Sequence, residues 1–185
     1  MKSTMPPEKW HESNERQEDY AMAVILKVFG DPSVYLGSGG ELERYLDDIF
    51  AKENRSGYVN LHFQLLWGED IMIDNALAVG VDYDSGYGAT LWWCDMGIAE
   101  EVSSSIGPDV ADFVWVSWNP NPPEVDPEIV ADSGCPTFFN RVSAIPLGQV
   151  RSVVEEYFRV GTGFRPDGTE WAKGHFTGEL YEEEG

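Results

Sequence analysis

Two apolar helical stripes stand at opposite ends of a block of strand-like sequence, and this arrangement limits the fold more than any other feature. Apolar residues recur at intervals of three and four in "ELERYLDDIFAKE" (41–53) and again in "LGQVRSVVEEYFRVG" (147–161). Between them lie four runs with the composition of strands, residues 58–67, 75–83, 88–94 and 111–118. Strands and helices do not alternate regularly. We therefore predict an α+β fold, a mainly antiparallel β-sheet with two main helices packed against it.

Shorter signals complete the predicted architecture. Residues 20–30 are rich in β-forming side chains and end in Gly-Asp-Pro, which predicts a first strand. The sequence "DSGYG" (84–88) predicts a hairpin turn. Residues 119–136 contain five prolines, so they predict an irregular connection. Residues 137–146 predict another strand, and "TEWAKG" (169–174) predicts a short final one.

The ends of the chain differ in composition from its middle. Residues 1–19 are polar and aperiodic, so we predict a flexible arm, followed by a single α+β domain over 20–173. Residues 174–185 form an acidic tail, of which "GELYEEEG" (178–185) is expected to be frayed. No run of apolar residues approaches a membrane span, and no apolar leader follows the N-terminus, which predicts a cytoplasmic location. Cys94 and Cys135 indicate neither a metal nor a disulfide framework.

Negative charge is concentrated in one long segment. The formal net charge is −21, yet residues 56–140 contain 14 acidic residues and no Lys or Arg. These acids cannot pair with bases inside their own segment. They must be solvated, pair with the ends of the chain, or meet a basic partner. A chain this acidic also repels nucleic-acid phosphates and anionic membranes, so neither is an expected partner.

The sequence lacks the usual catalytic motifs. It contains no GxSxG, no complete phosphate-binding glycine motif and no HExxH. The histidines His11, His62 and His175 are far apart, and His62 lies on the polar side of a predicted strand. We predict that the protein is not an enzyme and binds no cofactor.

Pairs of carboxylates leave one alternative open, a small carboxylate-dependent enzyme, with or without a metal. Three pairs could bind a cation or act as acid and base: Glu69 with Asp70, Asp82 with Asp84, and Glu100 with Glu101. The spacing Asp82-x-Asp84-x-Gly86 resembles the opening of a calcium loop. The rest of that loop is missing, because Trp93 occupies the place of its bidentate glutamate. We therefore predict an acidic hairpin turn and no metal site.

Tryptophans are the other notable residues of the central block. Adjacent Trp92 and Trp93 must point to opposite faces of a strand, and Trp115 and Trp118 also differ in parity. Some of these rings therefore lie outside the main core. They could anchor a protein partner, since tryptophan is a preferred interface residue, or be covered by a second layer of the fold. A plain ligand-binding domain with a tryptophan-lined pocket is a further alternative.

The stretch "GTGFRPDGTEW" (161–171) follows the second predicted helix. The carbonyl groups at a helix C-terminus repel anions, so the glycines do not indicate a phosphate loop. Gly161 or Gly163 instead predicts a left-handed helix cap, and Pro166 prevents the helix from continuing. We expect Trp171 to pack the last strand against the domain.

The segment "AIPLGQVRSVVEEYFRVGTGFRPDGTEW" (144–171) resembles the C-terminal signature of the Imm1 family of bacterial immunity proteins. That signature runs from a strand ending in Ile-Pro through an amphipathic helix to TG-x-RP and then a tryptophan. The matching residues here are Ile145, Pro146, Thr162, Gly163, Arg165, Pro166 and Trp171. The upstream order of strand, helix and hairpin is also similar, so the resemblance extends over roughly residues 20–171.

The resemblance implies a cytoplasmic member of a toxin–immunity pair. Proteins of this family are encoded beside polymorphic toxins, often nucleic-acid deaminases, and the implied partner is a cognate toxin domain whose active site is blocked. A toxin that acts on nucleic acid is expected to have a basic surface, which an acidic segment complements. We predict these partner-binding residues: Glu69, Asp70, Asp82, Asp84, Asp95, Glu100, Glu101 and Trp118.

Overall fold

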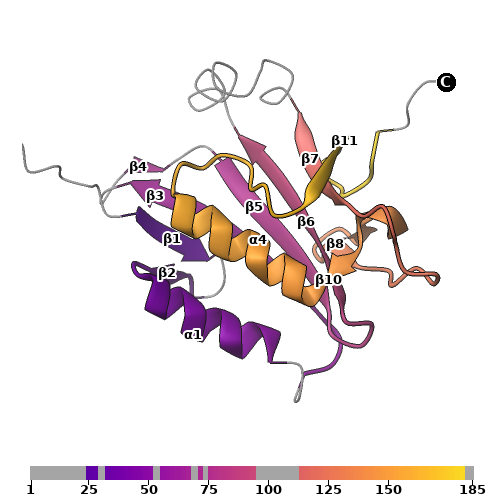
Figure 1. Cartoon of the computed structure of the whole chain (residues 1–185), viewed down its shortest axis with the longest axis horizontal. Coiled ribbons are helices and arrows are strands. Elements are labelled where there is room, and N and C mark those ends of the chain that lie inside the picture. Colours follow the sequence, from indigo (N-terminus) through magenta and orange to yellow (C-terminus); the bar gives the residue numbers. More distant parts are fainter. Residues whose placement is uncertain are drawn as a thin grey trace, which may run out of the picture.

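The computed structural model describes residues 24–28, 32–51, 55–67, 71–72, 75–94 and 113–181. Its main element is a nine-stranded sheet in which β3 (Tyr58–Trp67), β5 (Asn75–Asp82) and β6 (Tyr87–Cys94) form the long centre. The sheet order is β11-β7-β6-β5-β3-β1-β2, and every strand pair in the described part of the sheet is antiparallel. The predicted α+β fold with a mainly antiparallel sheet is therefore confirmed (Figure 1).

Shorter strands surround this centre. On one side lie β1 (Val24–Val28) and β2 (Val34–Leu36), and on the other β7 (Val114–Trp118) and β11 (Glu170–Gly174). Two further strands, β4 (Ile71–Met72) and β10 (Ile145–Pro146), pair with β3 and β6 respectively. The last strand of the chain, β11, forms one edge of the sheet, because its neighbour β7 already pairs with β6.

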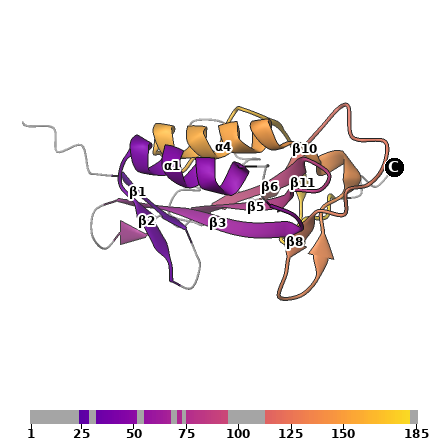
Figure 2. The same cartoon turned by 90° about the horizontal axis from the view of Figure 1, so that it is seen from below.

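Both helices cover the same face of the sheet (Figure 2). Helix α1 (Gly39–Phe50) begins after Ser38, whose hydroxyl accepts the N–H of Glu41 at 3.3 Å and caps the first turn. Helix α4 (Leu147–Val160) follows β10 directly. The apolar stripes of both helices pack with Phe63, Leu77 and Trp92 in the main core, so the helical periodicity predicted the buried faces correctly.

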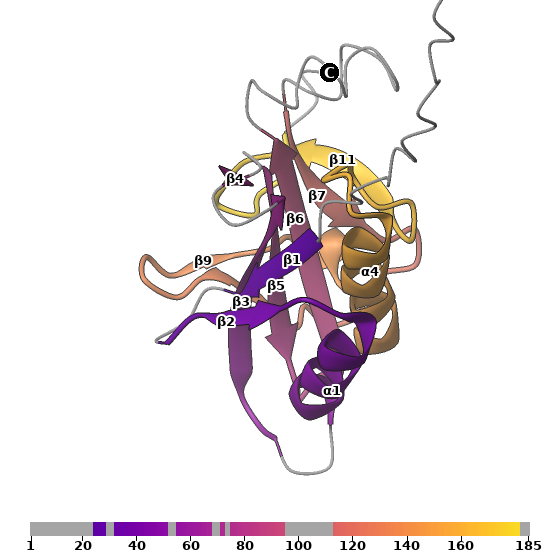
Figure 3. The same cartoon turned by 90° about the vertical axis from the view of Figure 1, so that its left-hand side faces the viewer.

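The other face of the sheet carries a smaller second layer, seen beside β5 in Figure 3. It consists of β8 (Val130–Asp132), β9 (Thr137–Phe138) and the 3₁₀ turn η2 (Arg141–Ser143). This corrects two predictions. Residues 119–136 include a strand, and residues 137–146 do not form a single one. The reason is tertiary: Ile129 and Phe139 turn inward to pack on Val116 and the alanines of β5 and β6, which interrupts the extended chain.

The helix end follows its sequence signals. Gly161 has φ 66° and caps α4 in the left-handed conformation, with its N–H bound to the carbonyl of Tyr157 at 3.3 Å. Gly163 also has a positive φ, of 79°. The indole N–H of Trp171 donates to the Pro166 carbonyl at 2.7 Å, which holds β11 against the loop. The structural interpretation of "GTGFRPDGTEW" is confirmed.

The segment after β11 is folded as far as Tyr181, contrary to the expectation of a frayed tail. His175 N–H donates to the Glu179 carbonyl at 2.8 Å, and Tyr181 N–H donates to the Lys173 carbonyl at 3.0 Å. Leu180 packs against the second layer, and the Phe176 ring meets the edge of Trp93 at 5.3 Å between centroids. These hydrogen bonds and the packing of Leu180 stabilise a hairpin that composition alone marks as a tail. We call residues 174–181 the tail hairpin.

No helix in the described part of the chain is long and apolar enough to cross a membrane.

Candidate partner-binding surface

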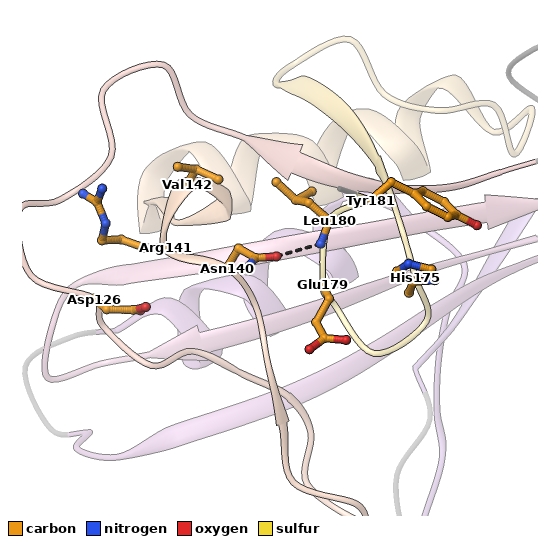
Figure 4. Close-up of a pocket in the computed structure, with 8 residues that line it drawn as sticks. All are labelled: Asp126, Asn140, Arg141, Val142, His175, Glu179, Leu180 and Tyr181. Atoms are coloured by element: carbon orange, nitrogen blue, oxygen red, sulfur yellow. Dashed lines mark hydrogen bonds between the residues drawn. The ribbon is translucent and has the colours of Figure 1, made fainter. Parts of the chain in front are cut away.

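Two adjoining hollows lie where the tail hairpin meets the sheet edge. The larger measures about 820 Å³ and has a mostly polar lining: Asp126, Asn140, Arg141, Val142, His175, Glu179, Leu180 and Tyr181 (Figure 4). The smaller measures about 570 Å³ and has an aromatic lining: Trp115, Trp118, Trp171, Ala172, Lys173, Leu180 and Tyr181. They share Leu180 and Tyr181, so the tail hairpin contributes to both. We call them the polar hollow and the aromatic hollow.

The polar hollow depends on a contact between distant parts of the chain. The Asn140 side-chain carbonyl accepts the N–H of Leu180 at 2.6 Å, drawn as the dashed line in Figure 4. This bond fixes the tail hairpin to the residues that precede η2. On the other side of the hollow, the Arg141 guanidinium donates to the Pro123 carbonyl at 2.7 Å and holds the Pro-rich connection in place. The rings of His175 and Tyr181 lie with their centroids 4.1 Å apart.

Aromatic rings hold the cations near the aromatic hollow. The Arg165 guanidinium lies over Trp115 at 4.1 Å from the ring centroid, and the Lys173 ammonium lies over Phe113 at 3.7 Å. Burial lowers the pKa of Arg165, an effect that the nearby carboxylate of Asp167 opposes. These two bases therefore contact rings instead of forming ion pairs within the described residues.

Trp118 is the predicted anchor that the structure places in a hollow. It lies at the end of β7, where its side chain lines the aromatic hollow and stays 36% exposed. The predicted opposition of Trp92 and Trp93 is also confirmed. Trp92 is fully buried in the main core, and Trp93 packs with the second layer on the other face. Trp115 and Trp118 point to opposite faces of β7, and Trp115 packs against the main core, although both residues line the aromatic hollow at the edge of the sheet.

The predicted acidic residues are placed unevenly. Asp82 ends β5 and Asp84 lies in the turn that follows it, whereas Trp118 ends β7, and neither acid lines the polar or the aromatic hollow. The Asp82 carboxylate accepts the N–H groups of Asp84 and Ser85 at 3.1 and 3.2 Å, and Asp84 accepts the N–H of Gly57 at 3.1 Å. These bonds stabilise an acidic turn. The other predicted acids, Glu69, Asp70, Asp95, Glu100 and Glu101, lie outside the described residues.

The acids of the base-free segment form no ion pairs where the structure describes them. The described ion pairs join Arg55 to Asp48 and Arg151 to both Asp47 and Glu155, each at 2.7 Å, and all five residues lie outside 56–140. Six described acids of the segment are left without a cationic partner: Asp82, Asp84, Glu124, Asp126, Glu128 and Asp132. Within the described residues, none of these six pairs with a base near either end of the chain. They are free to act on a partner or to be solvated.

A comparison with protein families identifies the chain. The model of the immunity protein family Imm1 matches residues 30–173. The chain belongs to the Imm1 family. The resemblance noted in the sequence is therefore confirmed, and the family implies an immunity protein that binds and counters a cognate toxin. Neither a curated protein nor a solved structure matches the chain.

The match to Imm1 covers much of the candidate surface but ends before its last component. It runs from the residues before β2 to Lys173 in β11, whereas Leu180 and Tyr181 follow it. The tail hairpin thus adds residues to this Imm1 protein beyond the matched region. Sequence analysis missed its contribution, although Gly178, with φ 85°, provides a turn signal between apolar Phe176 and Leu180.

The geometry of this Imm1 protein gives little support to the alternatives of a carboxylate-dependent enzyme or a plain ligand-binding domain. Among the described residues, no group of three or more His, Cys, Asp or Glu is placed to hold a metal ion. The Asp82 carboxylate binds the backbone of its own turn, and the Asp84 carboxylate binds the backbone N–H of Gly57. The aromatic hollow does correspond to the predicted tryptophan-lined site. It borders the sheet edge and an exposed tryptophan, which suits a protein partner.

The substitution Asn140→Ala should loosen the tail hairpin while leaving the rest of the domain folded. It removes the acceptor of the Leu180 N–H, a contribution of about 1 kcal/mol, so we expect the Leu180 amide to exchange roughly fivefold faster. Hydrogen exchange followed by NMR measures this. Thr177→Ala removes only an exposed bond to Glu179 and should leave the Leu180 amide as protected as in the wild type. Equal exchange in both variants would show that the Asn140 contact does not hold the hairpin.

Proposed function

We propose that this Imm1 protein binds a toxin domain that acts on nucleic acid, such as a deaminase, and neutralises it by covering its active site in the cytoplasm. The observation that carries the proposal is the set of acids in 56–140 that have no cationic partner in the described structure. Membership of the Imm1 family supports the role of an immunity protein, and the negative charge of the segment supports a partner with a basic surface. Occlusion needs no catalytic group, in keeping with the absence of catalytic motifs from the sequence.

The electrostatic argument begins with the substrate of the toxin. A protein that handles nucleic acid presents Lys and Arg to the phosphates, so its active-site entrance is basic. An acidic protein is attracted to that entrance over a distance of about 10 Å at ordinary ionic strength, and the attraction raises the rate of encounter. Unpaired carboxylates contribute fully to this field, whereas carboxylates paired with a neighbouring base contribute little. The six described acids of the segment are of the first kind.

Several of these acids lie close to the hollows. Asp126 lines the polar hollow, and exposed Glu124 and Glu128 lie next to it in the Pro-rich connection. Glu179 adds a further carboxylate from the tail hairpin. An interface centred on the hollows would therefore combine an aromatic anchor, Trp118, with surrounding acids. Tryptophan at the centre and charge at the rim is a common arrangement in protein interfaces.

The remaining predicted contacts belong to the same proposal. Asp82 and Asp84 are proposed to steer the toxin from the β5–β6 turn, together with Glu69, Asp70, Asp95, Glu100 and Glu101. Because Asp82 and Asp84 also support their turn, replacing them would alter both the charge and the fold. A clean test of steering requires an acid that makes no structural bond.

Coexpression with a toxin encoded in the neighbouring gene tests the proposal directly. The toxin domain should arrest growth when expressed alone, and this protein should restore growth and copurify with it. The purified complex should have no toxin activity on DNA or RNA. Growth arrest that persists despite expression of this folded protein would refute the proposed function for that toxin.

The substitution Glu124→Lys should slow association with the toxin by roughly threefold, because it weakens the field that steers a basic partner. Glu124 is exposed and makes no described hydrogen bond or ion pair, so the fold should be unaffected. Stopped-flow fluorescence at low and high salt measures the rate, and the difference should shrink as salt increases. Glu43→Lys on α1 makes the same charge change on a helix that covers the main core. Equal slowing by both variants would show that net charge acts without a localised acidic surface.

A further inference from the structure

Trp118 differs from Trp92, Trp93, Trp115 and Trp171 in that its side chain makes no hydrogen bond and no aromatic or cation contact within the described structure. The indole N–H groups of Trp92 and Trp171 donate to backbone carbonyls at 3.0 and 2.7 Å. The Arg165 guanidinium covers Trp115 at 4.1 Å from the ring centroid, and the Trp93 and Phe176 ring centroids are 5.3 Å apart. No hydrogen bond, aromatic contact or cation involves Trp118 within the described structure, and its side chain is 36% exposed. An exposed indole without such contacts, placed in a hollow, is available to bind a group of another molecule.

A carboxylate stands directly beside this ring. Glu170 in β11 is the cross-strand neighbour of Trp118 in β7. Side chains of directly opposed residues in an antiparallel pair lie on the same face of the sheet, with Cβ atoms about 4.5–5.5 Å apart. Glu170 is exposed and forms no ion pair within the described residues. Trp118 and Glu170 therefore offer an aromatic face and a negative charge to one ligand.

The same two strands show what ligand fits such a pair. On the other face of the β7–β11 pair, Lys173 lies opposite Trp115, and its ammonium lies 6.0 Å from the centre of that ring. Arg165 lies over the same ring at 4.1 Å. There the chain supplies its own cations to the aromatic surface. On the face that carries Trp118 the cross-strand neighbour is an acid instead, so the cation has to come from outside.

We propose that Trp118 and Glu170 form a receptor for an arginine side chain of the toxin. This inference rests on the proposed function and names the toxin side chain that binds beside Trp118. The toxin guanidinium stacks on the exposed indole and donates two hydrogen bonds to the Glu170 carboxylate. The net charge of −21 and the unpaired acids near the polar hollow favour approach of a basic group to this site.

Arginine fits this site better than the other side chains do. A planar guanidinium stacks on a ring and matches a carboxylate with two parallel donors, whereas a lysine ammonium is a compact, strongly hydrated charge. An apolar group would leave Glu170 desolvated without a partner, and an acidic group would be repelled by it. The predicted order of preference is therefore arginine, then lysine, with neutral analogues weaker than either.

A small-molecule probe tests the receptor without the toxin. N-acetyl-arginine amide, added to the full protein at low salt, should shift the Trp118 indole N–H resonance in a saturable way. The neutral isostere N-acetyl-citrulline amide should bind about fivefold more weakly. Glu170→Gln should remove most of this preference for arginine. A Trp118 shift no larger than that of Trp171, or a preference that Glu170→Gln leaves unchanged, would overturn the receptor.

The toxin complex gives the second arm. Trp118→Ala should weaken binding by about thirtyfold and Glu170→Gln by about fivefold, and the double variant should lose less than the product of the two. Tyr35→Ala is the matched control, because Tyr35 is 58% exposed on edge strand β2 but lies opposite Lys27. It should leave the affinity unchanged. If Trp118→Ala and Glu170→Gln both bind the toxin as tightly as the wild type, the receptor is refuted and the proposed function stands. If the wild-type protein binds the arginine probe but not the toxin, the proposed function is refuted and the receptor stands.

Discussion

Replacing Asn75 with alanine should lower the free energy of unfolding by about 3 kcal/mol, because it removes the centre of a buried polar network. Asn75 is 1% exposed and lies at the start of β5. Its amide N–H₂ donates to the Gly163 carbonyl, and its side-chain carbonyl accepts the Tyr157 hydroxyl at 2.8 Å. The indole N–H of Trp92 donates to the same Gly163 carbonyl at 3.0 Å. The network thus joins the sheet, helix α4 and the loop after it.

The loss of stability in Asn75→Ala comes mainly from buried polar groups that lose their hydrogen-bond partner. The Tyr157 hydroxyl loses its acceptor in a fully buried position, and an unsatisfied buried polar group costs about 1–3 kcal/mol. Loss of the bond to Gly163 and the small cavity add to this cost. Burial strongly raises the pKa of Tyr157, so the hydroxyl stays protonated at neutral pH and still needs a hydrogen-bond acceptor.

Urea unfolding followed by tryptophan fluorescence measures the change. Asn121→Ala is the control, since Asn121 is exposed and its side chain makes no described bond, and this variant should stay within about 0.5 kcal/mol of the wild type. A loss of less than about 1 kcal/mol for Asn75→Ala would mean that water or rearranged groups replace the network.

The second large effect is expected from Gly80→Ala, which should destabilise the domain by roughly 3 kcal/mol through overpacking. A Cβ atom at this position of β5 would lie 2.5 Å from the Val130 carbonyl oxygen and 2.9 Å from an Ile129 methyl group. The nearest atom belongs to the backbone of β8, so relief requires the whole second layer to move. Gly88 in β6 plays the same role toward α4 on the opposite face, with Val150 at 3.0 Å from its added Cβ.

The same substitution at Gly148 should change stability in the opposite direction. Gly148 lies in the first turn of α4, and an added Cβ would meet no atom within 4 Å. Alanine there restricts the unfolded chain and favours the helix, so stability should rise by about 0.5–1 kcal/mol. Thermal unfolding of the two variants in parallel separates steric overlap from the general effect of glycine replacement. A neutral Gly80→Ala would show that β8 does not approach β5 as closely as described.

Local sequence patterns predicted the parts of the fold that local physics determines. The alternation in residues 58–67 predicted β3, and the two apolar stripes predicted α1 and α4, because each pattern reflects one face against the main core. The region 119–146 was harder. There the short strands β8 and β9 depend on contacts with Val116 and the β5–β6 alanines, and no periodicity within the segment encodes such contacts.

The candidate surface was predictable only in part for the same reason. The parity of Trp118 indicated a ring outside the main core, and the structure places it in a hollow. Its neighbour Glu170 is 52 positions away in the chain and meets it only through the register of β7 with β11. The tail hairpin was missed because acidic composition suggested a frayed end, whereas its backbone hydrogen bonds and the packing of half-buried Leu180 on the second layer hold it in place.

The way this protein distributes its charges makes its stability and its proposed association depend on ionic strength in opposite ways. Its acids form no ion pairs in the described part of residues 56–140, and two of its bases, Arg165 and Lys173, are held by aromatic rings. Rising ionic strength therefore relieves repulsion within the folded chain, but it also screens the attraction to the basic partner proposed above. Under the proposed function, a rise in salt that makes the protein more robust also delays its capture of the toxin, so protection depends on how much of it is already present.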